Sequence, residues 1–371
     1  MFKSITFFFL WCFLSLNAQT VSTASGSNFF DSLAQDQQGN IYCSDFFGDS
    51  IFKYDINGNV STFKSGLINP NGLDVNEQNE LFLCENGTNS IKRYDNNGNL
   101  ITAYTAGVNG PTGIRTIPNT TDLLFVEYGN NTLKRLELDG TVTTLFSGSP
   151  LNGPSGIVFI NGEIYVSNFN DRKIMHFDNG ALTMITQLPA TGANNNFLGF
   201  LAGSHTTLYA TQWGEHKIYS INPLNGDTAI YAGTTNGATD GDLSEATFSF
   251  PNGIYIDNTN NIMYISEIGT GSLRIIEDAS LSTKDFNSGF NDIDLITYNQ
   301  NDTLNISANL SSNKKVSIKL FDITGKEVLK KEFKNTNPSF NESVAVKDFS
   351  SGTYILLFSQ EGKIISKKLV L

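Results

Sequence analysis

The chain has 371 residues, of which 28 are Phe and 33 are Gly, while only 16% are charged. This length fits two domains better than one, and the composition favours an all-β protein with many tight turns over a helical or disordered one. The formal net charge of −12 argues against a nucleic-acid partner, because an acidic surface repels the phosphate backbone.

The first residues have the pattern of a secretory signal peptide. A short apolar stretch over residues 5–16 is followed by Ala18, after which a signal peptidase is expected to cut, before Gln19. The stretch is too short to stay as a membrane anchor, and no later segment is apolar enough to form a transmembrane segment. Cys12 lies inside the apolar run, where a lipidated cysteine would not. The sequence therefore predicts soluble export with residues 1–18 removed.

One segment of the chain recurs six times. Each copy ends on an apolar residue, and these anchors are Ile51, Ile91, Leu133, Ile174, Ile218 and Leu273. The steps between successive anchors are 40, 42, 41, 44 and 55 residues. A period near 40 residues, with four short strands in each unit, is typical of propeller blades. Residues 19–280 are therefore predicted to form a six-bladed β-propeller.

The strands within one repeat also suggest how the ring closes. In the second repeat the four expected strands cover residues 71–75, 81–84, 91–94 and 100–104. The sixth repeat runs out near residue 277 without a fourth strand of its own. Residues 20–23 resemble the fourth strand at residues 59–62. We therefore expect the N-terminal strand to complete the sixth blade, which removes the open sheet edges.

A second module follows the propeller. The pattern of the repeats stops near residue 280, and residues 281–295 have the polar composition of a linker. Residues 296–371 contain further short strands separated by turns, which favours a small β-sandwich of the Ig-like type. The predicted fold class is thus all-β throughout.

The propeller repeats resemble the NHL family and its gluconolactonase-like relatives among six-bladed propellers. The residues that carry the resemblance are the loop 232–241, the segment 245–248 and the segment 251–254, which are similar to the connector between blades of bacterial members. The resemblance covers roughly residues 20–280. It implies a fold rather than an activity, since this fold hosts lyases, lactonases and pure binding modules.

The C-terminal module is similar to the type A sorting domain of the type IX secretion (Por) system of Bacteroidetes. The motif residues behind this resemblance are Gly325, Gly352, Tyr354, Lys367 and Lys368. The resemblance implies the secretion machinery as a partner, and a protein that passes through the periplasm to be secreted or displayed on the outer-membrane surface. One departure is the entry strand, because residues 298–301 lack the prolines that are usual there.

Blade topology places two sets of residues on one rim of the central channel, since the second strand returns to the face where the first strand starts. The set at the start of the first strands is Asp31, Asn71, Thr112, Ser155, Leu198 and Asn252. The set at the end of the second strands is Asp45, Glu85, Glu127, Asn168, Gln212 and Glu267. Aromatic residues next to this second set are Phe46, Phe47, Tyr128, Phe169 and Trp213.

Two interpretations of this rim stay open. Carboxylates and amides among exposed rings suit a carbohydrate or peptide ligand. The arc of Asp31, Asn71 and Asn252 would suit a hard cation such as Ca²⁺ or another divalent ion, although the pattern requires no cofactor. The alternative is structural: the acids of the second set would accept hydrogen bonds from N–H groups of neighbouring loops, and the aromatic side chains would pack between blades.

Three functions follow from these alternatives. The sequence favours a non-catalytic binding module with its ligand at the channel rim. A metal-dependent, lactonase-like hydrolase is the second hypothesis, because Asn71 and Asn252 each precede a glycine as in gluconolactonase-like propellers. A scaffold that binds proteins through its loops is the third. A zinc site is not expected, because His176, His205 and His216 fall on different parts of their blades.

Cys43 and Cys84 are the cysteines left after residue 18. Export permits a disulfide between them. A large apolar core does not need one, so two buried free thiols are the simpler expectation.

Overall fold

The computed structural model describes residues 19–189, 197–204, 206–277, 295–300, 303–310, 315–322, 326–334, 339–350, 352–360 and 363–370. The chain divides into two compact units, residues 1–280 and 281–371. Within the described ranges the one helical element is a short 3₁₀ turn, Asn86–Thr88, and every other element is a strand. No helix in those ranges is long and apolar enough to cross a membrane.

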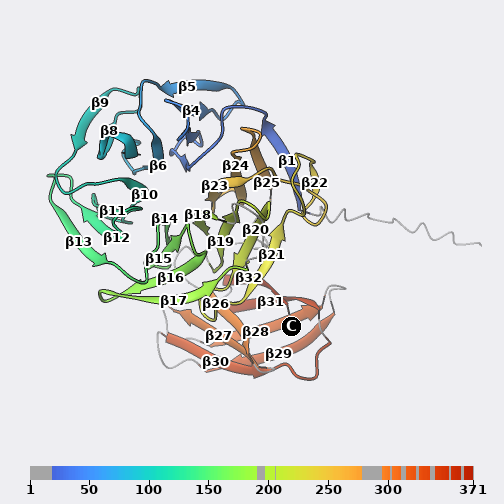
Figure 1. Ribbon diagram of the computed structural model, residues 1–371. Coiled ribbons are helices and arrows are strands. Elements are labelled where there is room, and N and C mark those ends of the chain that lie inside the picture. Colours follow the sequence, from blue (N-terminus) through green and yellow to red (C-terminus); the bar gives the residue numbers. More distant parts are fainter. Residues whose placement is uncertain are drawn as a thin grey trace, which may run out of the picture. The chain divides into compact units, whose positions relative to one another are not determined.

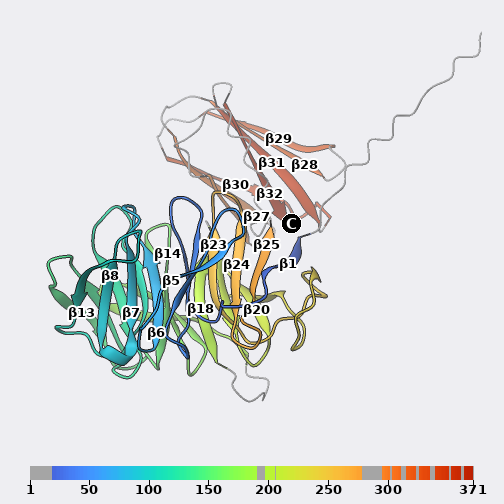
Figure 2. The ribbon, with the colours of Figure 1, turned by 90° about the horizontal axis from the view of Figure 1, so that it is seen from above.

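The first unit is a ring of six sheets that follow one another in chain order (Figure 1). Each of the first five sheets consists of four consecutive antiparallel strands. The strands run across the thickness of the disc, from one face to the other (Figure 2). The first strands of neighbouring sheets contact one another around the centre. The described part of the first unit is therefore a six-bladed β-propeller, as the repeats predicted.

The first five blades have regular boundaries. Blade 1 contains β2 (Leu33–Gln35), β3 (Ile41–Ser44), β4 (Ile51–Tyr54) and β5 (Val60–Lys64). Blade 2 contains β6 (Pro70–Val75), β7 (Leu81–Glu85), β8 (Ser90–Tyr94) and β9 (Leu100–Tyr104). Blade 3 contains β10 (Pro111–Thr116), β11 (Leu123–Glu127), β12 (Thr132–Leu136) and β13 (Val142–Ser147). Blade 4 contains β14 (Pro154–Ile160), β15 (Glu163–Asn168), β16 (Lys173–Asp178) and β17 (Ala181–Gln187). Blade 5 contains β18 (Leu198–Gly203), β19 (Leu208–Gln212), β20 (Lys217–Ile221) and β21 (Thr228–Ala232).

The sixth blade is closed by the N-terminal strand. Its own strands are β23 (Pro251–Asp257), β24 (Ile262–Glu267) and β25 (Leu273–Glu277). β1 (Thr20–Ser25) pairs antiparallel with β25, so that Val21 lies opposite Ile276, and β22 (Gly241–Asp242) pairs on its outer side. Figure 1 shows β1, in blue, beside the orange β25. The expected closure is confirmed, and it joins the two ends of the ring without leaving β25 as an open edge.

A buried guanidinium fastens this closure. Arg274 of β25 is fully buried and donates to Glu267 Oε1 at 3.2 Å and to Asp240 Oδ1 at 2.7 Å. Asp240 in turn accepts hydrogen bonds from the backbone N–H and the hydroxyl of Thr23 on β1, at 3.0 and 2.9 Å. Arg274 also donates to two backbone carbonyls of the loop 239–247. One side chain therefore ties together the sixth blade, the loop that leads into it and the N-terminal strand.

The inner strands pack so closely that glycine is required where they meet. A Cβ atom on Gly72 would lie 1.9 Å from the carbonyl oxygen of Thr112, and one on Gly253 would lie 2.0 Å from that of Asp31. Non-bonded atoms do not approach so closely, so any other residue would force the backbones apart. This close approach brings the residues that start the first strands into one narrow ring.

Apolar clusters between neighbouring blades form the core. In one of them Phe82 and Cys84 of blade 2 pack with Leu123 and Phe125 of blade 3, all fully buried. Each large side chain buried in this way contributes about 1.5–3 kcal/mol relative to an exposed one. Cys43 and Cys84 are both buried and free, which confirms the expectation of two thiols rather than a disulfide.

The second unit is a small β-sandwich. One sheet has the order β26 (Leu295–Gln300), β27 (Thr303–Asn309) and β30 (Ser339–Ala345). The other has the order β29 (Glu327–Phe333), β28 (Val316–Asp322), β31 (Thr353–Gln360) and β32 (Lys363–Val370). Ile306 and Phe340 of the first sheet share a buried cluster with Ile318, Leu356 and Phe358 of the second. The two sheets therefore pack face to face around an apolar core.

The turn before β31 is held by a tyrosine. Tyr354 is buried, and its hydroxyl donates to the backbone carbonyl of Ser350 at 2.9 Å, while its ring stacks on Phe349. Gly352 is exposed in the turn between them. The aromatic pair and this hydrogen bond account for Phe349 and Tyr354 of the motif.

The remaining residues of the sorting motif lie on the last strand or outside the described ranges. On β32, Lys367 pairs with Leu356 and Lys368 pairs with Ile355. Lys367 is half-buried in the sheet. Gly325 lies outside the residues that the structure describes.

Candidate functional site

Strand register places both predicted sets of rim residues at the same end of the inner hairpins. Glu267 of the second set pairs with Pro251, the residue before Asn252 of the first set. Glu127 pairs with Pro111 in the same way, next to Thr112. The two sets therefore share one face of the propeller, which we call the rim face.

The alignment of the fifth blade from sequence is wrong by one residue. Leu198 pairs with Gln212, at the place taken in the other blades by Pro70, Pro111, Pro154 and Pro251. Gly199 is therefore the fifth member of the first set, and Leu198 is a fully buried core residue. The error arose because no proline marks the start of this strand.

Three side chains form a fixed chain of hydrogen bonds where the sixth blade meets the first. Trp213 Nε1 donates to Asn252 Oδ1 at 2.7 Å, and Asn252 Nδ2 donates to Asp31 Oδ1 at 2.6 Å. An indole N–H can only donate, so Trp213 fixes which way the Asn252 amide is turned. Burial raises the pKa of Asp31 to about 8, the Asn252 hydrogen bond opposes this rise, and the nearby Asp45 adds to it. Asp31 is therefore a largely protonated carboxyl at neutral pH.

The hydrogen bonds among Trp213, Asn252 and Asp31 do not fit the cation site predicted from Asp31, Asn71 and Asn252. A hard cation needs oxygen ligands. The Asn252 oxygen already accepts a hydrogen bond from Trp213, and the Asn252 NH₂ group, not an oxygen, faces the Asp31 carboxyl. Over the described ranges, no group of three or more His, Cys, Asp or Glu side chains is placed to hold a metal ion.

The two described histidines form hydrogen bonds with different partners. His176 Nε2 lies 2.6 Å from Glu163 Oε2 on the outer part of blade 4. His216 Nδ1 accepts the backbone N–H of Phe250 at 3.2 Å, between blades 5 and 6. His205 lies outside the described residues. The two described imidazoles thus have different partners on different blades.

Three of the four carboxylates of the second set are each engaged by a loop N–H group and a cation, whereas the fourth, Asp45, accepts the backbone N–H of Gly48 at 2.9 Å. Glu127 accepts the backbone N–H of Asn109 at 2.8 Å and the ammonium of Lys134 at 2.9 Å. Burial alone would raise the pKa of Glu127, but its hydrogen bonds, with Lys134 foremost, bring that pKa below its ordinary value. Two other blades repeat this pattern of one loop N–H and one cation. Glu85 accepts the backbone N–H of Ile68 and pairs with Lys92. Glu267 accepts the backbone N–H of Ser249 and pairs with Arg274. These contacts agree with the alternative prediction that the acids of the second set accept hydrogen bonds from N–H groups of neighbouring loops.

Blades 4 and 5 carry an amide at this position, and each amide donates to a backbone carbonyl of the preceding loop. Asn168 Nδ2 donates to the Pro150 carbonyl at 2.9 Å, and Gln212 Nε2 donates to the Pro189 carbonyl at 2.9 Å. These amides therefore donate to a loop carbonyl, where the glutamates of the other blades accept from a loop N–H.

Replacing Asn168 by Asp should destabilise the propeller by about 1–3 kcal/mol at neutral pH, because a carboxylate would face the Pro150 carbonyl without a donor. Urea unfolding of the chain without residues 1–18 measures the change. Asn97→Asp, the same substitution on an exposed turn, should alter stability by less than about 0.5 kcal/mol. Equal, small effects of both substitutions would contradict this account of the second set.

Asp31 should make stability depend on pH. Its carboxyl ionises near pH 3.8 when unfolded but stays protonated up to about pH 8 when folded. The folded form binds more protons between these values, so stability falls as pH rises from about 4 to about 8. Asp31→Asn should remove this fall, so its stability relative to the wild type should rise between pH 5 and pH 8. Urea unfolding at pH 5 and pH 8 tests this; parallel changes in both proteins would contradict it.

Four aromatic rings from three neighbouring blades contact one another on the rim face. Phe169 stacks on Phe197 with 4.5 Å between ring centroids, and it meets Trp213 at 5.0 Å and Tyr128 at 6.1 Å, both edge-on. Tyr128 is 40% exposed, and the other three rings are half-buried. The rings thus pack between blades and also present a surface. We call Tyr128, Phe169, Phe197 and Trp213 the aromatic rim surface.

Amide side chains border this surface. The Tyr128 hydroxyl donates to Asn170 Oδ1 at 2.8 Å, and Asn170 Nδ2 donates to Asn152 Oδ1 at 3.0 Å. Phe197, Asn170 and Asn152 were not among the predicted site residues. The position of Phe197 immediately before a first strand is the one sequence signal that would have pointed to it.

Comparison with protein families identifies the C-terminal module. Residues 300–371 match the model of the secretion system C-terminal sorting domain. The segment is a sorting domain of the type IX secretion system, and it directs export to the cell surface or secretion. This agrees with the resemblance seen in the motif residues.

Solved structures share the propeller fold at low sequence identity. An auxiliary nutrient binding protein from Bacteroides thetaiotaomicron is 19% identical, with a TM-score of 0.59, over 70% of this chain and 76% of that one. A gluconolactonase from Xanthomonas campestris is 16% identical, with a TM-score of 0.55, over 70% and 89%. Virginiamycin B lyase from Staphylococcus aureus is 15% identical, with a TM-score of 0.50, over 95% and 99%. Such identities indicate a common fold and no more. No curated protein matches the sequence.

Proposed function

We propose that the protein is an exported binding module that holds a carbohydrate against the aromatic rim surface and does not transform it. The observation that carries this proposal is the group of four contacting, partly exposed rings bordered by amides. The C–H face of a sugar ring packs on an aromatic face, and its hydroxyl groups bond to neighbouring amides.

The distribution of apolar side chains around the channel favours an extended ligand. Phe47 is 73% exposed on the rim face of blade 1, and Ile68, at the start of blade 2, is also exposed. Six blades in chain order put blade 1 across the ring from blade 4, which carries Phe169. Apolar contacts on both sides of the channel suit a glycan chain that crosses it better than a single sugar.

The engagement of the rim carboxylates supports binding rather than hydrolysis. Glu85, Glu127 and Glu267 are each paired with a cation of their own blade, and Asp31 is held by Asn252. A general acid or base must reach the substrate, and these groups are already committed within the protein. The name of one fold relative, an auxiliary nutrient binding protein, is consistent with a binding role.

Glycan and peptide arrays probed with the chain lacking residues 1–18 test the proposal. We expect binding to glycans, with longer chains bound more tightly than single sugars. Binding to peptides alone would favour the protein-interaction scaffold instead. Binding to neither class would contradict a ligand-binding role for the rim face.

A further inference from the structure

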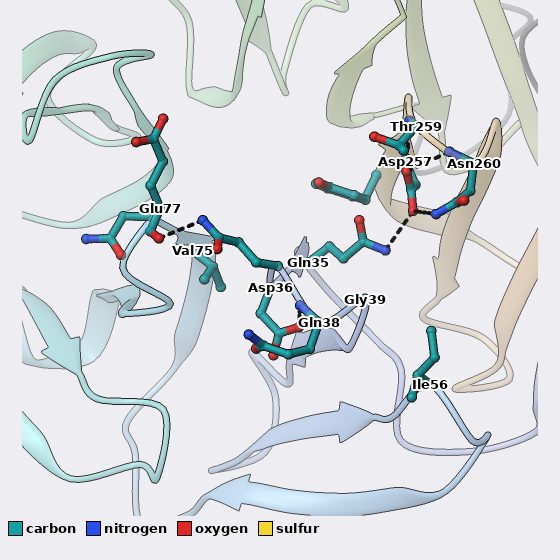
Figure 3. Close-up of a pocket in the computed structure, with 13 residues that line it drawn as sticks. Gln35, Asp36, Gln38, Gly39, Ile56, Val75, Glu77, Asp257, Thr259 and Asn260 are labelled. Atoms are coloured by element: carbon teal, nitrogen blue, oxygen red, sulfur yellow. Dashed lines mark hydrogen bonds between the residues drawn. The ribbon is translucent and has the colours of Figure 1, made fainter.

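The propeller has a hollow on the face opposite the aromatic rim surface. Its volume is about 410 Å³, and it is lined by the turns that join the first and second strands of blades 6, 1 and 2 (Figure 3). These turns lie at the other end of the inner strands from Asp31 and Asn252. The hollow is therefore separate from the rim face, and nothing argued so far uses it.

Two carboxylates in the walls serve to hold the turns. Asp36 Oδ1 accepts the backbone N–H groups of Gln38 and Asn40, and its Oδ2 accepts the Tyr42 hydroxyl. Asp257 likewise accepts the backbone N–H groups of residues 259 and 260. Each carboxylate already accepts four hydrogen bonds within the protein, so neither is available to bind a cation or to act as a base.

Gln35 and Tyr255 of the lining offer one acceptor and one donor. Gln35 Nε2 donates to Asp257 Oδ2 at 3.0 Å, which leaves Gln35 Oε1 without a hydrogen-bond partner among the described residues. The Tyr255 hydroxyl also has none within those residues. Burial, together with the charge of Asp74 and Asp257, raises the pKa of Tyr255, so the group stays protonated and able to donate.

The rest of the lining includes both apolar and amide side chains. Val75 and the exposed Ile56 supply apolar surface on either side of the blade 1 turn. Gln37 Nε2 donates to the backbone carbonyl of Glu77 at 2.6 Å, and the Gln38 side-chain amide has no partner among the described residues. Glu77 also lines the hollow, and its negative charge disfavours an anionic ligand.

We propose that this hollow binds a neutral polyhydroxylated ligand the size of one sugar unit. A sugar hydroxyl both donates and accepts, so one ring can satisfy the Gln35 oxygen and the Tyr255 hydroxyl together. Its C–H groups can pack on Val75, Ile56 and the Tyr255 ring. The volume lies in the range of small-molecule sites. This site does not depend on the proposed function of the rim face, because the two lie on opposite faces.

Saturation-transfer NMR and calorimetry with glucose, galactose, mannose and N-acetylglucosamine, on the chain without residues 1–18, test the proposal. We expect at least one of these sugars to bind. Tyr255→Phe keeps the ring and removes the donor, and it should weaken binding about three- to tenfold, as for a lost hydrogen bond. Gln38→Ala, on the exposed turn, should weaken binding without affecting folding.

The rim face provides the control. Trp213→Ala should leave the binding of the single sugar unchanged, and Tyr255→Phe should leave array-identified glycan binding at the rim unchanged. The proposal is overturned if none of the four sugars binds, or if Tyr255→Phe and Gln38→Ala bind like the wild type. Loss of single-sugar binding in Trp213→Ala would also overturn it, since that sugar would then sit on the rim face.

Discussion

Replacing Arg274 by Met should destabilise the propeller by about 3–5 kcal/mol, because it leaves the fully buried Glu267 carboxylate without its cation. It also removes the hydrogen bond that holds Asp240 against the closing strand. Urea unfolding of the chain without residues 1–18 measures the loss. Trp213 fluorescence follows the propeller, because Trp213 is then the single tryptophan of the chain.

Arg135→Met is the matched control. The Arg135 side chain is 44% exposed and pairs with Asp122 at the surface of blade 3. Exposed ion pairs contribute about 0–1 kcal/mol, so this substitution should cost little. If Arg274→Met cost no more than Arg135→Met, the closure of the ring would not depend on the buried guanidinium.

Replacing Trp213 by Ala should weaken glycan binding at the rim face about 30-fold or more, as for truncation of a central aromatic contact. The substitution removes the largest ring of the aromatic rim surface and also releases the Asn252 amide. Trp213→Phe keeps an aromatic face but loses the N–H, and it should retain an intermediate affinity. Calorimetry with a glycan identified on the array measures all three proteins.

Leu224→Ala controls for the loss of an exposed apolar side chain. Leu224 is 75% exposed in the turn between β20 and β21, at the opposite end of the blade from Trp213. Its substitution should leave the affinity unchanged. Wild-type affinity in Trp213→Ala would contradict the proposed site and would favour the scaffold hypothesis, in which the channel rim is inert.

The overall fold could be predicted because the same sequence segment recurs in every blade. Six anchors at a period near 40 residues predicted the number of blades, and the similarity of residues 20–23 to residues 59–62 predicted the closure. Arg274 could not be recognised in the same way. Its role depends on the path of the loop 239–247, which brings Asp240 and two carbonyls to it, and loop paths are not encoded in a local pattern.

The candidate site could be predicted only in part. Ring closure correctly implied that Asp31 and Asn252 would be neighbours. The direction of the Asn252 amide depends on Trp213, a residue of another blade, so the amide turns its NH₂ group rather than its oxygen toward Asp31. The carbonyls that accept from Asn168 and Gln212 could not be predicted, because they depend on the loop geometry.

The hollow on the opposite face had no sequence signal of its own. Gln38, Thr259 and Asn260 are residue types found in any exposed turn. They matter here because turns of three blades, far apart in the chain, converge on one space over Gln35 and Tyr255. Such convergence is a property of the closed ring.

The most direct test of the central claim uses the emission of Trp213. An array-identified glycan is titrated into the chain without residues 1–18, and fluorescence and calorimetry are recorded on the same sample. If the glycan packs on the aromatic rim surface, Trp213 emission changes saturably with the dissociation constant found by calorimetry. Heat of binding without any change in Trp213 emission would contradict the account and place the ligand elsewhere.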